Sequence, residues 1–167
     1  VRERGIAELV LLGDRSAIEQ ANRRVGLDLG EVTVIDPANS PLRLAFAQEY
    51  ARLRAHKGVT VEIAADAVVD PSYFGTLMVH GGHADGMVSG SITTTAATLR
   101  PALEIVRTAP GVSIVSSVFL MCLADRVLVY GDCAINPDPN ADQLADIAIS
   151  SAQTAAQFGI EPRVAML

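Results

Sequence analysis

The sequence has only two cysteines, a single lysine and no apolar run long enough to span a membrane. A membrane is therefore not expected as a partner, and with no visible secretory signal we expect a cytoplasmic protein. Cys122 and Cys133 lie in strand-like surroundings and are predicted to be reduced core thiols, a disulfide or a catalytic role being disfavoured. Because Lys57 is the only lysine, any phosphate contact is expected to come from an arginine.

Basic residues as a class are outnumbered by acidic ones. The 167-residue chain has a formal net charge of -6, and 50% of its residues are hydrophobic. This composition is typical of a packed globular protein rather than a disordered one. The acidic balance argues against nucleic acid as the partner, but it leaves room for an anionic small molecule, because a few arginines can make a locally positive surface.

The first third of the chain predicts a parallel sheet. Residues 9–12 form a short apolar strand, and Ser16 with Glu19 makes a capping-box pattern that starts a helix ending near Gly26. Residues 32–35 form the next strand. Strand, helix and strand at this spacing are typical of a βαβ unit.

Helices and then a hairpin are predicted over the remainder. Proline, glycine and capping residues delimit helices over residues 41–56, 60–69 and 71–81. The β-rich runs 113–120 and 127–130 predict an antiparallel hairpin, a helix follows to residue 158 with Asn140 or Asp142 as its cap, and residues 163–167 resemble a buried strand. The change in pattern places a domain boundary near Gly111, which gives domains of residues 1–111 and 112–167. Both ends look cut, so we expect a fragment of a longer protein.

The stretch from Ala84 to Pro101 is the candidate for anion binding. A short strand at Met87 and Val88 is followed by small residues, three threonines and a helix that carries Arg100. Free backbone N–H groups at a helix N-terminus, hydroxyls and an arginine favour phosphate or carboxylate. The alternative is a plain connection with Thr95 or a neighbour as the helix N-cap.

Three other polar groups have two interpretations each. His80, His83 and Asp85 could suggest a metal site, but two histidines without further ligands at proper spacing argue against one. The basic residues Arg52, Arg54 and Lys57 could bind a ligand or could simply complement the dipole of their helix. The turn-rich residues 131–139 could line a site through Asp132 or Asn136, or could form the loop before the last helix, which residue type slightly favours.

Several long segments resemble the phosphate acetyltransferase (phosphotransacetylase) family. They include ADGMVSG, TLRPALEIV, GVSIVSSVF, DRVLVYGDCAINPDPNADQLADIAISSA and FGIEPRVAML, and the resemblance covers most of the chain. It implies two α/β domains with mainly parallel sheets around a cleft, similar to isocitrate and isopropylmalate dehydrogenases, with both domains incomplete here. It also implies reversible acetyl transfer between acetyl phosphate and coenzyme A by direct thiolate attack, in a homodimer, with coenzyme A as a substrate and no cofactor or metal.

The resemblance also assigns site residues. Arg100 matches a family arginine implied in contacting the phosphate-bearing substrate and in catalysis, and Arg54 matches one implied in coenzyme A or phosphate binding. Ser89, Thr94 and Thr95 lie in the loop that should face the same pocket, and we expect them to be donors.

The chain also departs from the family pattern. Thr93 and Ala97 stand where the family often has histidine and aspartate. The family's catalytic serine–arginine pair and aspartate come from a C-terminal segment that this chain does not include, so the fragment alone is expected to be inactive. Two alternatives to the acetyltransferase stay open: a phosphate butyryltransferase, and the non-catalytic acyl-coenzyme A-binding regulatory domain found in some malic enzymes.

Overall fold

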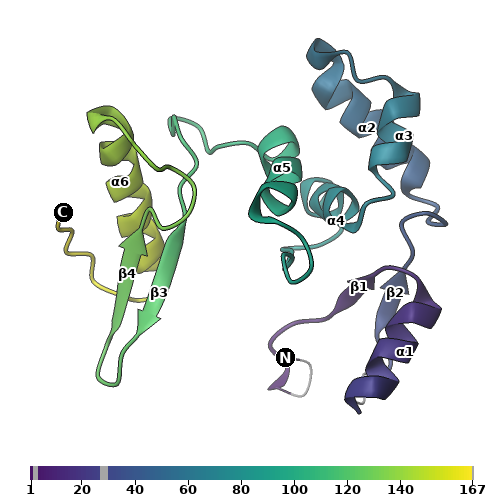
Figure 1. The fold of residues 1–167 in the computed structure, drawn as a ribbon, viewed down its shortest axis with the longest axis horizontal. Helices are drawn as coiled ribbons and strands as arrows, with labels where there is room; N and C mark the ends of the chain where they lie inside the picture. Colours follow the sequence, from purple (N-terminus) through teal and green to yellow (C-terminus); the bar gives the residue numbers. More distant parts are fainter. Residues whose placement is uncertain (2–3, 27–29, 167) are drawn as a thin grey trace. The chain divides into compact units, whose positions relative to one another are not determined.

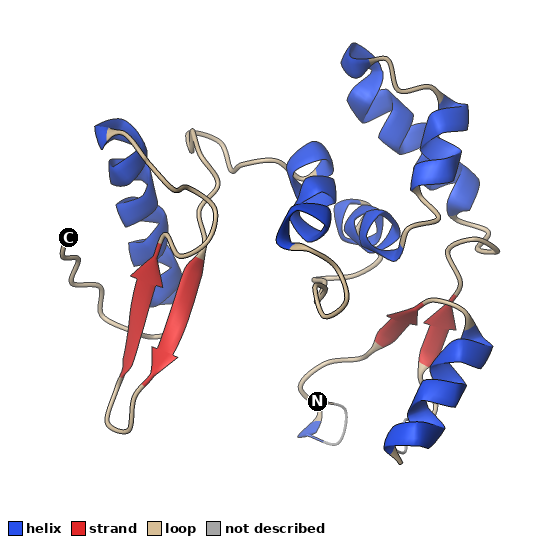
Figure 2. Cartoon of the chain, viewed as in Figure 1, coloured by secondary structure: helices blue, strands red, loops and turns tan. Residues whose placement is uncertain are grey.

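A computed structural model describes residues 1, 4–26 and 30–166 of the chain (Figure 1). The chain divides into two compact units, Val1–Arg107 and Thr108–Leu167. Helices account for most of the regular structure in both (Figure 2). No helix of the described ranges is both long enough and apolar enough to cross a bilayer.

The first unit begins with the predicted βαβ unit. Strand β1 (Val10–Leu12) and strand β2 (Thr33–Ile35) pair in parallel, and helix α1 (Arg15–Val25) connects them. The prediction that Ser16 caps α1 was wrong. The side chain of Asp14 accepts hydrogen bonds from the Ala17 amide and the Ser16 hydroxyl, so the N-cap lies two residues before Ser16.

Four longer helices and a short 3-10 turn complete this unit. They are α2 (Arg43–Arg54), the turn η2 (Ala55–Lys57), α3 (Val61–Ala67), α4 (Pro71–His80) and α5 (Thr95–Ile105). The predicted boundaries are close, because side chains in the sequence provide the caps: Thr60 caps α3 and Asp70 caps α4. Helix α2 starts later than predicted, since the hydroxyl of Ser40 accepts from the Leu42 amide in a preceding turn.

The core of the first unit lies among α2, α3, α4 and α5. Phe74 is 0% exposed and meets Phe46 in an edge-on arrangement with ring centroids 4.9 Å apart. The Arg43 guanidinium donates to the carbonyl of Ala65, which joins α2 to α3. Burial of apolar side chains is the main force that holds these helices together, and it fixes the faces that α2, α4 and α5 present.

The second unit contains a hairpin and one helix, as predicted, but the first strand begins five residues later than predicted, and residues 113–117 form no strand. Strands β3 (Val118–Cys122) and β4 (Val127–Gly131) pair antiparallel, with Phe119 opposite Tyr130. Helix α6 (Ala141–Gln157) begins with a capping box in which Asn140 and Gln143 exchange side-chain and backbone hydrogen bonds. A Cβ at Gly131 would collide with the hydroxyl of Ser151, so α6 lies directly against the hairpin there.

Three predictions about apolar segments were wrong. Met87 and Val88 form no strand, and the side chain of Val88 is fully exposed. Residues 163–166 are also exposed and without strand structure. Cys122 is exposed on β3 and Cys133 is only half-buried, so neither is a core thiol. In each case, local apolar character was taken for burial, but burial needs a neighbouring strand or helix that covers the segment.

Candidate functional site

The N-terminus of α5 uses its threonines differently from one another. The hydroxyl of Thr94 accepts from the Ala97 amide at 3.2 Å and caps the helix, as the alternative interpretation allowed for a neighbour of Thr95. Thr95 is the first residue of α5 and is exposed. Ser89 is exposed in the preceding loop and forms no side-chain hydrogen bond to any residue that the structure describes. These groups therefore lie at the surface of the first unit.

Arg100 lies on α5, six residues after the cap. Its side chain is exposed and makes no ion pair or hydrogen bond within the described ranges. Its charge acts on Tyr73 of α4, where it opposes the overall rise in the pKa of that phenol. An unpaired, accessible guanidinium is suited to bind an anion from solution.

Arg54, the last residue of α2, lies beside Glu104 of α5. Its Nη2 atom is 3.5 Å from Glu104 Oε1, and both side chains are 20% exposed. The Nε atom of Arg54 is buried and has no hydrogen-bond partner among the described residues. Glu104 therefore occupies only part of the donor capacity of this guanidinium, which has five N–H groups.

Glu104 joins α2, α4 and α5 through one carboxylate. Its Oε2 atom accepts from the hydroxyl of Tyr50 at 2.7 Å and from that of Tyr73 at 2.9 Å. The two tyrosine rings meet edge-on, with centroids 5.3 Å apart. Burial raises the pKa of Tyr50, and the hydrogen bond to Glu104 raises it further, so this phenol stays a donor at neutral pH. Tyr50, Arg54, Tyr73 and Glu104 form the Glu104 cluster.

The structure brings the two predicted arginines to one region of the first unit. Arg100 and Glu104 are four residues apart and share a face of α5, and Glu104 contacts Arg54 on α2. The sequence analysis missed Glu104, Tyr50 and Tyr73. The available signal was weak: Tyr50 lies four residues before Arg54 on the same helix, and it and Tyr73 are two of only three tyrosines in the chain.

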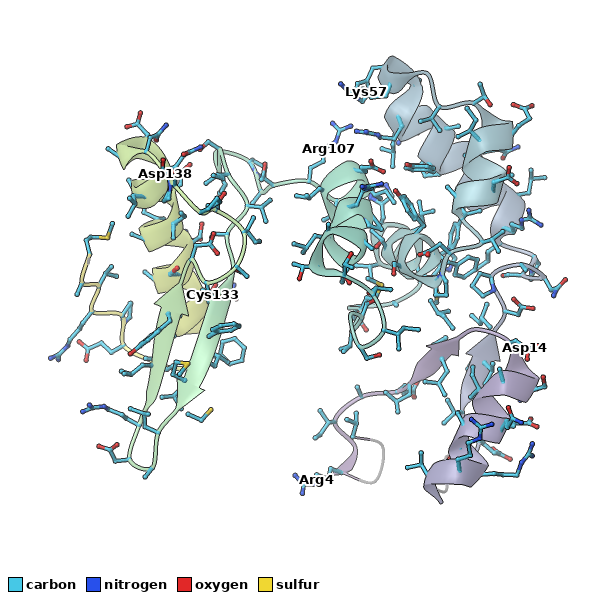
Figure 3. All side chains as sticks on the ribbon, viewed as in Figure 1. Arg4, Asp14, Lys57, Arg107, Cys133 and Asp138 are labelled. Carbon is cyan, nitrogen blue, oxygen red and sulfur yellow. The ribbon has the colours of Figure 1, made fainter. Side chains whose placement is uncertain are left out.

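The neighbouring basic residues have distinct environments. Arg52 is exposed and pairs with Glu49 at 2.7 Å. Arg107 follows α5 with φ 65°, and its Nη2 donates to the Leu53 carbonyl at 3.3 Å, next to Arg54. Figure 3 shows Arg107 at the end of α5 and Lys57 at the end of α2 and η2. Arg52 therefore pairs within its own helix, whereas Arg54 contacts Glu104 on α5.

His80 and His83, which the sequence analysis considered as metal ligands and argued against, make other contacts. His80 Nε2 lies 3.1 Å from Glu49 Oε1, and the His83 ring packs edge-on against Phe46, with centroids 5.6 Å apart. The described ranges contain no group of three or more side chains able to hold a metal ion.

In the second unit, Asp132 organises the loop between β4 and α6. Its Oδ1 accepts from the amide and hydroxyl of Ser117 and from the Ala134 and Ile135 amides; its Oδ2 accepts from the Asn136 amide and side chain. Burial alone would raise the pKa of this carboxyl, but these hydrogen bonds lower it well below its ordinary value. The arrangement supports the loop interpretation of residues 131–139, because it uses the Asp132 side chain internally.

Two cavities lie away from the two arginines. One cavity, of about 310 Å³, is lined by residues at the end of β2 and before α2, and another, of about 660 Å³, lies between β4, α6 and residues 160–166. Neither is lined by Arg54 or Arg100. Arg100 is exposed in the first unit, whereas the Arg54 side chain is 20% exposed.

A family model described as phosphate acetyl/butaryl transferase matches residues 1–167. The chain belongs to this family. Relatives named phosphate acetyltransferase are 62% identical in Synechocystis sp. and 48% identical in Corynebacterium glutamicum, over 98% and 99% of this chain. The alignments cover 24% and 50% of those two proteins, so this family member spans a quarter to a half of their length.

Solved structures of family members agree with the fold. A phosphotransacetylase from Streptococcus pyogenes superposes with a TM-score of 0.91 at 39% identity, over 99% of this chain and 51% of that one. The EutD phosphotransacetylase from Staphylococcus aureus gives 0.85 at 39% identity, over 93% and 47%. The predicted family is therefore confirmed, together with its mixed α/β architecture containing a parallel sheet.

Proposed function

We propose that the protein containing this chain is a phosphate acetyltransferase, which transfers an acetyl group reversibly between acetyl phosphate and coenzyme A. The observation that carries the proposal is the 48–62% identity to proteins of that name over nearly the whole chain. The proximity of both Arg54 and Arg100 to Glu104 adds a local basis for phosphate binding. The names of the relatives favour this activity over the butyryltransferase and the regulatory domain.

The chemistry requires a bound phosphate and an attacking thiolate. The coenzyme A sulfur attacks the acetyl carbonyl, a C–S bond forms, and the bond between the carbonyl carbon and the phosphate oxygen breaks. The thiol proton passes to a base, and phosphate leaves with the electron pair. Arg54 and Arg100 would hold phosphate oxygens of the substrates, because a guanidinium fork matches them.

The hydroxyls at the start of α5 would supplement the arginines. Ser89 and Thr95 are exposed and available as donors. Thr94 uses an oxygen lone pair for the cap, so its O–H can still donate. Coenzyme A is a substrate in this scheme, and no step calls for a metal.

The larger architecture is part of the proposal. Residues 1–111 would belong to a first α/β domain and residues 112–167 would begin a second, with mainly parallel sheets around a cleft as in isocitrate and isopropylmalate dehydrogenases. The catalytic serine, arginine and aspartate of the family would come from outside these 167 residues, so the isolated segment would be inactive. A homodimer in the cytoplasm stays a prediction.

The test is acetyl-coenzyme A formation by the full-length protein and by its Arg54→Ala and Arg100→Ala variants. Loss of one charge-assisted hydrogen bond, about 1.5–3 kcal/mol, corresponds to roughly a tenfold to hundredfold fall in kcat/KM. The matched control is Arg52→Ala, on the same helix and already paired with Glu49, which should change kcat/KM less than twofold.

Three results would contradict parts of the proposal. A folded full-length protein without turnover that still binds coenzyme A would indicate the regulatory domain. Faster turnover with butyryl phosphate than with acetyl phosphate would indicate the butyryltransferase. Wild-type rates in both arginine variants would remove the two arginines from the site.

A further inference from the structure

Glu104 is a carboxylate placed among groups that a phosphate-binding surface would be expected to keep free of negative charge. It lies close to both arginines proposed to bind phosphate, with Arg54 Nη2 at 3.5 Å and Arg100 one turn earlier on α5. We propose that Glu104, held by Tyr50 and Tyr73, is a positioning residue that orients the Arg54 guanidinium toward the phosphate-bearing substrate. This inference rests on the proposed function.

The orientation of Glu104 itself is well defined. Its Oε2 receives two phenol hydrogen bonds, from an α2 residue that is 5% exposed and from a half-buried α4 residue. Tyrosine has few rotatable bonds, and the edge-on packing of these two rings limits them further. With Oε2 held by Tyr50 and Tyr73, Oε1 is the atom left to face Arg54.

This geometry restricts the rotamers of the Arg54 side chain but does not use all of its N–H donors. A free arginine side chain carries about 2 kcal/mol of rotamer entropy, part of which is lost when it binds a ligand. The contact with Glu104 restricts that freedom before the substrate arrives. Because the contact with Glu104 involves only Nη2, at 3.5 Å, the terminal N–H groups that do not face Glu104 remain for an anion, whereas the Nε atom is buried.

The net charge of these groups also favours a role for Glu104 in positioning Arg54 over a role in neutralising the charge of the site. The Arg54 and Arg100 guanidinium groups and the Glu104 carboxylate together carry one net positive charge, and Arg100 stays exposed and unpaired within the described ranges. A half-buried ion pair is by itself a weak source of stability. If Glu104 acts by positioning Arg54, replacing Glu104 should weaken substrate binding. If Glu104 only stabilised the fold, the replacement would not have this effect.

The experiment is a double-mutant cycle in the full-length protein, with Glu104→Gln, Arg54→Ala and the combined variant. Glutamine keeps an acceptor for the tyrosines but removes the charge that faces Arg54. Glu104→Gln should raise KM for the same substrate whose KM rises in Arg54→Ala, by roughly three- to tenfold, with kcat within about twofold. In the Arg54→Ala background, it should change that KM less than twofold, because the group through which it acts is gone.

Controls separate positioning from folding. Tyr73→Phe should raise the same KM by a smaller factor, and Glu19→Gln, an exposed position on α1, should leave it unchanged. Melting temperatures of all variants are measured alongside. Equal KM effects of Glu104→Gln with and without Arg54 would overturn the inference, as would a lowered melting temperature with an unchanged KM.

The two proposals fail in different ways. Absence of turnover in the wild type would refute the acetyltransferase but would not decide the role of Glu104. In that case, the same cycle is measured as the Kd for coenzyme A by calorimetry, where coupling between Glu104 and Arg54 would support positioning. Additive effects on Kd, or no binding of coenzyme A by the wild type, would overturn it.

Discussion

Replacing Asp132 by asparagine tests whether this carboxylate holds the loop before α6 together. The change keeps the size and shape of the side chain, but it turns one acceptor oxygen into an N–H donor group. In the wild type, Oδ2 accepts from the Asn136 amide and from its Nδ2, both at 2.6 Å, while Oδ1 serves Ser117. An asparagine that keeps its oxygen toward Ser117 must therefore point its own N–H groups at two donors.

The expected cost follows from those two contacts. A hydrogen bond to a charged group contributes about 1.5–3 kcal/mol, so losing two costs about 3–6 kcal/mol. That loss should lower the melting temperature of the full-length protein by at least about 4 °C. Asp138→Asn is the matched control, because Asp138 is exposed in the same loop (Figure 3) and has no hydrogen bond or ion pair to any described residue.

The pH dependence gives an independent check. The pKa of Asp132 lies below its unfolded value near 3.8, so its contribution is fully present above that pH and is lost as the pH falls toward the folded value. The melting-temperature difference between wild type and Asp132→Asn should be constant from pH 7 to 5 and should narrow below about pH 4. A variant that melts within 1 °C of Asp138→Asn at pH 7, on the order of a few tenths of a kcal/mol, would refute this account of the loop.

Three further predictions concern stability of the same full-length protein. Phe74→Ala should cost about 3–5 kcal/mol in the free energy of unfolding, measured by denaturant titration, because a fully buried ring leaves a cavity; a cost below 1 kcal/mol, about a fifth of that scale, would contradict its placement. Gly131→Ala should cost about 1–3 kcal/mol through collision with the Ser151 hydroxyl, and Ser151→Ala should restore part of it; no recovery in the double variant would argue against that contact. The hydrogen bond from Arg52 lowers the pKa of Glu49 from 4.5 to about 2, so the stabilisation that Glu49→Gln removes should be full above pH 4.5 and fade as the pH falls toward 2; a difference that instead grows on acidification would be the wrong sign.

Much of the local structure was predictable because its causes lie close together in the chain. Thr60 and Asp70 are capping residues directly before helix-forming segments, and the structure uses both as caps. Where two residues could cap the same helix, the local pattern predicted the wrong one: Asp14 caps α1, although Ser16 forms a capping-box pattern with Glu19. The strand predicted at 87–88 failed for a different reason, since a strand depends on a partner that sequence pattern does not provide.

The candidate site also contains residues that the sequence indicates and residues that only the fold brings together. Arg54 and Arg100 could be named from the sequence, because they lie in segments that resemble a known family. Glu104 could not, because its contacts with Tyr50 and Tyr73 join residues 54 and 31 positions apart. Nothing local distinguishes a glutamate that accepts two phenol hydrogen bonds from one on a solvated helix face.

The sequence by itself determined the starts of α3 and α4, the βαβ unit, the pairing of two strands in a hairpin and the family, since each depends on neighbouring residues or on long ordered motifs. The tertiary structure alone decided which apolar segments are buried and which polar side chains share a carboxylate. Packing of α2, α4 and α5 around Phe74 sets the faces of those helices, and this brings Arg54 to Glu104. Burial and long-range hydrogen bonding are properties of the packed chain, so only the folded arrangement specifies them.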